Sequence, residues 1–214
     1  GLGDVYKRQL VIMARRYQVV ILGGGFPVPV GDDAHTFQRA QLVGRDGQIL
    51  SSYDKIHLFD VDLPDGSSYR ESAGFSSGAE LPPVVDVPGL CRVGVSICYD
   101  VRFPELYRHL IGAGAELLMI PAAFTAFTGK DHWQVLLQAR AIENTAYVLA
   151  PAQTGTHAGR RQSHGHAMVI DPWGTVLADA GVSAGAAIAP VDLDHLQRIR
   201  TQMPCLQHRR TALF

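Results

Sequence analysis

The sequence has few cysteines, few lysines and no long hydrophobic run. Its 214 residues include three widely spaced cysteines, which make no disulfide framework and favour a reducing, cytoplasmic location. No segment reaches the roughly 18 consecutive apolar residues of a membrane span, and the apolar run at 10–13 is cut short by Arg15 and Arg16, unlike a signal peptide. With 19 basic and 20 acidic residues the net charge is −1, so we expect no nucleic-acid or membrane partner.

A starting methionine is also missing, and residues 1–9 show no apolar periodicity. We therefore leave 1–9 unassigned and assign 10–214 to one domain that is incomplete at its N-terminus. With 47% hydrophobic residues, a chain of this length can bury a core without disulfide or metal support.

Apolar runs bounded by glycine and proline alternate along the chain and predict one mixed α/β domain. The glycine triplet at 23–25 is no dinucleotide fingerprint, because Val28 stands where that motif needs glycine, and it is expected to end a strand. A long polar loop is predicted at 60–80. The predicted strands are 19–22, 37–43, 49–53, 84–87, 92–97, 117–120, 147–149, 166–170 and 175–177, and helices are predicted at 10–17 and from Pro104, Asp131 and Asp194.

Cys98 is the leading candidate nucleophile. It follows a predicted buried strand and precedes a helix that starts at Pro104, which is the arrangement of a nucleophile elbow. At such a turn the side chain is held near backbone N–H groups that can receive an oxyanion. Cys91 and Cys205 lack this context and are interpreted as small buried apolar residues.

Lys55 is one of three lysines among nineteen basic residues, and it precedes the apolar segment 56–59. A lysine in apolar surroundings can act as a compact point charge or lose its proton. A solvated lysine at the end of a strand is the alternative interpretation.

Three separated segments, in order, resemble the carbon–nitrogen hydrolases of the nitrilase superfamily, and the similarity runs from about Leu10 to Phe214. They read YDKIHLFD at 53–60, ICYDVRFPE at 97–105 and GHAMVIDPWG at 165–174. Segments 121–124, 128–129, 132–133 and 140–144 are similar to the Nit amidase branch. The segment AQTGTH at 152–157 looks most like the deaminated glutathione amidases, with the omega-amidases, which act on α-keto amides, as the alternative.

The resemblance implies an α/β fold, a four-layer αββα sandwich, and homodimers or higher homo-oligomers. It implies hydrolysis of a small linear carboxamide to acid and ammonia through a thioester, with no cofactor. Carried over to this sequence, Cys98 is the nucleophile, Lys55 and the Tyr99 backbone N–H stabilise the oxyanion, and Glu71 orients the lysine. For substrate binding we predict Phe124, Thr125, Arg160 and Arg161, since arginine suits the substrate's carboxylates.

The general-base glutamate that the resemblance implies upstream of Lys55 has no match, because Glu71 is the first glutamate in the sequence. We therefore expect a sandwich lacking its N-terminal segment, a fragment that is inactive alone. A binding or assembly module remains an alternative.

Two other chemistries stay open. The histidines at 164 and 166 share a strand face and could ligate a metal, but no acidic or cysteine cluster accompanies them, so no metal is expected. A histidine approaching Cys98 in space would make a thiol protease, which leaves Lys55 unexplained.

Overall fold

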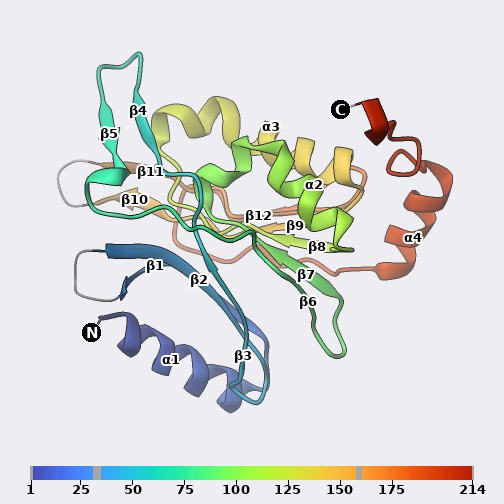
Figure 1. Ribbon diagram of the computed structural model, residues 1–214, viewed down its shortest axis with the longest axis horizontal. Helices are drawn as coiled ribbons and strands as arrows, with labels where there is room; N and C mark the ends of the chain where they lie inside the picture. Colours follow the sequence, from blue (N-terminus) through green and yellow to red (C-terminus); the bar gives the residue numbers. More distant parts are fainter. Residues whose placement is uncertain (1, 31–34, 158–160, 214) are drawn as a thin grey trace.

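The computed structural model describes residues 2–30, 35–157 and 161–213. It stacks four layers, as Figure 1 shows: helix α1 (Leu2–Tyr17), a three-stranded sheet, a six-stranded sheet, and the helices α2 (Pro104–Gly112) and α3 (Ala126–Asn144). Each sheet buries one face against the other sheet and covers its second face with helices. The predicted αββα sandwich is confirmed.

The three-stranded sheet is an antiparallel meander of β1 (Ile21–Val30), β2 (His35–Val43) and β3 (Ile49–Asp54). The predicted strands 37–43 and 49–53 correspond to β2 and β3, which pair as a hairpin. Gly47, in the Asp-Gly turn that joins these strands, has φ +81°, which glycine adopts without steric cost.

The six-stranded sheet has the order β13-β12-β9-β8-β7-β6, with β7, β8 and β9 parallel to one another. Its strands are β6 (Val84–Asp86), β7 (Arg92–Val95), β8 (Leu117–Met119), β9 (Tyr147–Ala150), β12 (Met168–Ile170) and β13 (Val176–Asp179). Two small hairpins, β4 (Asp60–Asp62) with β5 (Ser68–Arg70) and β10 (Thr154–Thr156) with β11 (Gln162–His164), lie outside this sheet. Helix α4 (Leu193–Gln202) and the 3-10 turns η1 (Glu71–Ala73), η2 (Cys98–Arg102) and η4 (Thr211–Leu213) complete the elements.

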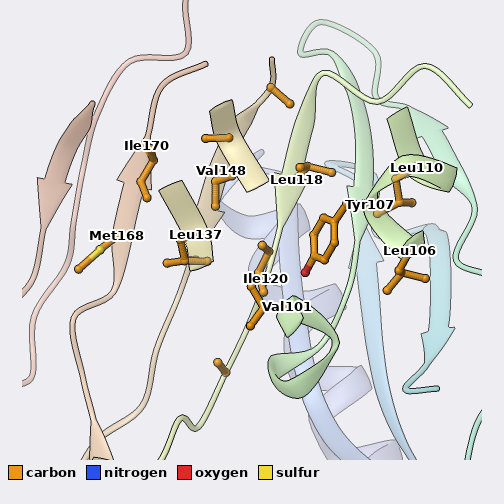
Figure 2. Packing of buried hydrophobic residues seen from close by; sticks show 14 of the residues in the cluster. Val101, Leu106, Tyr107, Leu110, Leu118, Ile120, Leu137, Val148, Met168 and Ile170 are labelled. Atoms are coloured by element: carbon orange, nitrogen blue, oxygen red, sulfur yellow. The ribbon is translucent and has the colours of Figure 1, made fainter. Parts of the chain in front are cut away.

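Two hydrophobic cores lie on opposite faces of the six-stranded sheet. One packs Tyr107 of α2 and Leu137 of α3 against Leu118 and Ile170 of the sheet, as Figure 2 shows. The other packs residues such as Leu42 of the smaller sheet between the two sheets. No helix in the described part of the chain is long and apolar enough to cross a membrane.

Two expectations about the first 30 residues are corrected. The stretch 1–9, left unassigned, continues helix α1 back to Leu2; its described side chains from 4 to 9 are exposed, which explains the missing periodicity. Strand β1 does not end at the glycine triplet but passes through it with a bulge between Gly23 and Phe26, and Gly25 takes φ +69°. A Cβ on Gly24 would lie 2.4 Å from Pro121, so this strand needs glycine where it approaches the end of β8.

Two further corrections concern loop and helix boundaries. The loop at 60–80 contains the β4–β5 hairpin and the turn η1. Helix α3 begins at Ala126 rather than at Asp131, because the Thr125 side chain accepts a hydrogen bond from the Thr128 N–H and caps the helix.

Candidate active site

Cys98 lies three residues after the end of β7 and is the first residue of the turn η2. Its φ of +50° is in the left-handed region, which costs a non-glycine residue roughly 1 kcal/mol or more. The Cys98 N–H donates to the Pro121 carbonyl at 2.9 Å, which ties the turn to the end of β8. Contacts such as this hydrogen bond therefore stabilise the positive φ of Cys98, which is unfavourable in an unfolded chain.

Lys55 and Glu71 form a salt bridge beside this turn. Lys55 follows β3 and is only 3% exposed, and its Nζ donates to Glu71 Oε2. The same oxygen accepts a hydrogen bond from the Phe59 N–H at 2.6 Å. Because both partners are largely removed from water, this pair is more strongly coupled than a surface salt bridge.

Cys98 and the Lys55–Glu71 pair line one cavity of about 710 Å³. Cys98, Lys55, Glu71 and Tyr99, the four predicted catalytic residues, all line it. The predicted substrate-binding residues Phe124, Thr125 and Arg161 line it as well, whereas Arg160 lies outside the described residues.

Burial and charge oppose one another at the thiol. Burial raises the pKa of the Cys98 thiol, while the charge of Lys55 and a hydrogen bond from the Ala123 backbone act to lower that pKa. Among the described residues that line the cavity, Glu71 is the only carboxylate. The net rise keeps the thiol protonated at neutral pH, so its attack requires a proton acceptor.

Aromatic rings and the Arg161 guanidinium form one part of the cavity lining. Phe59 contacts Tyr69 and Tyr99 with ring centroids 5.2 and 4.9 Å apart. The Arg161 guanidinium lies over the Tyr69 ring at 5.5 Å, at the start of the β10–β11 hairpin's second strand. This stacking brings a cation to the cavity lined by the thiol.

Asp100, which joins the two halves of the site, is not among the site residues predicted from the sequence. Asp100 is fully buried, and its carboxylate accepts hydrogen bonds from Tyr53 and His57, on either side of Lys55. An aspartate in the predicted turn, two residues after the candidate nucleophile, was a signal that could have identified it.

The histidines at 164 and 166 stack with ring centroids 4.6 Å apart, and His166 Nδ1 lies 2.9 Å from Asp179 Oδ2. Over the described ranges no group of three or more histidine, cysteine, aspartate or glutamate side chains is arranged to hold a metal ion.

A cysteine at a strained turn after a strand, which lines the same cavity as the Lys55–Glu71 salt bridge in an αββα sandwich, defines a thiol-dependent hydrolase. Residues 4–201 match the family described as carbon-nitrogen hydrolase. The chain belongs to this family.

Known relatives agree with that assignment. The chain is 60% identical over 201 residues to a deaminated glutathione amidase of Synechocystis sp., covering 94% of this chain and 74% of the relative. The crystal structure of the C. elegans NitFhit protein has a TM-score of 0.91 and 42% identity, covering 98% of this chain and 51% of that one. An amidase of Nesterenkonia sp. AN1, solved with acrylamide added to its active-site cysteine, has a TM-score of 0.75 and 29% identity, covering 94% of this chain and 74% of that one.

Proposed function

We propose that the protein hydrolyses a linear carboxamide through a thioester on Cys98. The observation that carries this proposal is that the Cys98 thiol and the Lys55–Glu71 pair share one cavity. The active-site cysteine of the Nesterenkonia amidase and the amidase names of the relatives support it.

The reaction runs in two stages on these residues. The sulfur attacks the amide carbonyl, and Lys55 with the Tyr99 N–H stabilises the oxyanion. The proton of the thiol is transferred to the amide nitrogen, and collapse of the tetrahedral intermediate breaks the C–N bond and releases ammonia, or an amine from a substituted amide. Water then cleaves the thioester to the acid and restores the thiol. Glu71, bonded to the lysine and the Phe59 N–H, orients the ammonium.

Trapping the thioester tests the nucleophile. After acid quenching of the full-length protein with substrate, we expect mass spectrometry to find the acyl adduct on the peptide that contains Cys98. Cys98→Ala should lose adduct and turnover, whereas Cys205→Ala, outside the cavity lining, should keep both. Turnover in the Cys98→Ala variant would refute the mechanism.

We further propose that the substrate carries a carboxylate and that deaminated glutathione is its natural form, as the name of the Synechocystis relative suggests. Arg161 is the cation in the cavity lining suited to that carboxylate, with Thr125 and Phe124 beside it. An α-keto amide such as α-ketoglutaramate is the alternative substrate.

One comparison decides between these substrates, and one variant tests the role of Arg161. We expect a higher kcat/KM on deaminated glutathione than on α-ketoglutaramate, and the reverse order would favour an omega-amidase. Because an ionic hydrogen bond contributes about 1.5–3 kcal/mol, Arg161→Gln should raise KM about 10- to 100-fold. Arg209→Gln, outside the cavity lining, is the matched control. An unchanged KM in Arg161→Gln would contradict the assignment of Arg161.

The family resemblance also leads us to propose a homo-oligomer, and the three widely spaced cysteines lead us to propose a reducing, cytoplasmic compartment where Cys98 stays a free thiol. Light scattering coupled to size-exclusion chromatography tests the assembly, and a mass of 23.2 kDa, that of one chain, would contradict it.

A further inference from the structure

Asp100 is a carboxylate with no exposed surface, and four donors converge on it. Oδ2 accepts from the Tyr53 hydroxyl at 2.8 Å and from the Ile97 N–H at 2.9 Å. Oδ1 lies 3.2 Å from the His57 backbone N and 2.7 Å from His57 Nδ1. Burying an unpaired carboxylate would be strongly unfavourable, so these four contacts are what allow it to remain in the core.

The donors come from both catalytic segments. Tyr53 and His57 lie two residues before and two residues after Lys55, and Ile97 is the residue before Cys98. The Asp100 N–H also donates back to the Ile97 carbonyl at 3.1 Å, which closes a small ring around the strained cysteine. Burial and the neighbouring Asp100 charge raise the pKa of Tyr53, so its hydroxyl stays protonated and remains a donor.

We propose that Asp100 is a positioning residue for catalysis, whose carboxylate holds Lys55 in place relative to Cys98. Asp100 is absent from the cavity lining and acts only through the residues it binds. The proposal rests on the proposed function in that Lys55 and Cys98 are the reacting pair. A 1 Å displacement of a reacting group can lower the rate about 10²-fold. Because the Asp100 carboxylate bonds the segment around Lys55 and the segment around Cys98, losing it should lower the rate of turnover.

Asparagine at this position cannot replace the aspartate. Its single carbonyl oxygen can accept from one side, but its NH₂ group would face donors on the other. We expect Asp100→Asn to lower kcat, expressed per titrated Cys98 thiol, about 10²-fold while KM stays unchanged. Asp179→Asn, which alters another histidine-bonded carboxylate outside the cavity lining, is the matched control and should keep its kcat.

Tyr53→Phe provides a second variant in which the charge of Asp100 is kept. Tyr53→Phe should lower kcat less than Asp100→Asn does. The double variant should be no slower than Asp100→Asn, because both changes remove the same Tyr53–Asp100 hydrogen bond. Losses that multiply in the double variant, or an Asp100→Asn protein with a lower melting temperature but full kcat per titrated thiol, would overturn the proposal.

Thiol alkylation separates this proposal from the proposed reaction, because it needs no substrate. With iodoacetamide at pH 7, Tyr53→Phe should slow modification of Cys98 about tenfold, the effect of about one pKa unit on a thiol that is mostly protonated. Tyr147 is another buried tyrosine, and its hydroxyl donates to the Asp192 carbonyl. The Tyr147→Phe variant should be alkylated at the same rate as the wild-type protein. Equal rates in all three proteins would overturn the positioning role, while slower alkylation in a protein that hydrolyses no amide would refute only the proposed function.

Discussion

At the scale of single residues, the reactivity of Cys98 is set by two opposing influences. Burial disfavours the thiolate and the neighbouring ammonium of Lys55 favours it, with burial the stronger of the two. The raised pKa keeps the thiol protonated at neutral pH, which limits side reactions of the sulfur in its cavity of about 710 Å³.

Removing the charge of Lys55 should make the thiol less reactive. Lys55 lowers the pKa of Cys98, so Lys55→Met should raise that pKa further and shift the pH profile of alkylation to higher pH. At pH 7 to 8 we expect alkylation about tenfold slower or more, because a nearby opposite charge shifts a pKa by about 1–3 units. Lys130→Met makes the same chemical change at an exposed lysine and should leave the profile in place. A profile in Lys55→Met that stays in place or moves to lower pH would contradict the electrostatic role.

At the scale of elements, helix α3 and the β10–β11 hairpin meet without space for a side chain. Gly129, in the first turns of α3, lies so close to β11 that an added Cβ would be 2.3 Å from the His164 ring. The hairpin carries Arg161 and Ser163 of the cavity lining, so this close approach also sets the wall of the site. Position 129 needs glycine because a Cβ there would clash with His164 of β11, and not because of its backbone angles.

Gly129→Ala should therefore destabilise the protein by about 1–3 kcal/mol, the usual cost of overpacking. Gly112→Ala is the matched control, since a Cβ there meets nothing within 4 Å. Its free energy of unfolding should stay the same or rise by up to about 1 kcal/mol through helix propensity. Urea unfolding of the two variants compares them directly, and equal midpoints would show that β11 moves aside without cost.

At the scale of the whole molecule, the six-stranded sheet is shared by two cores. Leu42 lies in the core between the sheets, and Leu137 and Trp133 lie in the core beneath α2 and α3. The sheet residues of both cores belong to the same short strands, as Leu117 and Leu118 of β8 do. Loss of either core therefore removes support from the other.

We expect one cooperative unfolding transition. Leu42→Ala and Leu137→Ala should each cost about 2–5 kcal/mol, the range for buried leucines. Both should lower the midpoint followed by fluorescence of the fully buried Trp133, although Leu42 lies in the other core. Leu177→Ala, at an exposed position, is the control, and its unfolding midpoint should change little. If Leu42→Ala left the unfolding midpoint measured by Trp133 fluorescence unchanged, the two cores would unfold independently.

The sequence by itself determined the features that depend on neighbouring residues. The Asp-Gly turn between β2 and β3, the start of α2 at Pro104 and the cysteine at the strand end follow from local backbone preferences, and the motifs around Lys55 and Cys98 carried the family. Only the tertiary structure decided the passage of β1 through its glycine triplet, the cap at Thr125 and the hydrogen-bond partners of Asp100. Those features depend on partners distant in the sequence, such as Pro121 for Gly24 and Tyr53 for Asp100, or on competition between two local caps. Local periodicity carries no information about such partners, because they meet only after the two sheets have packed.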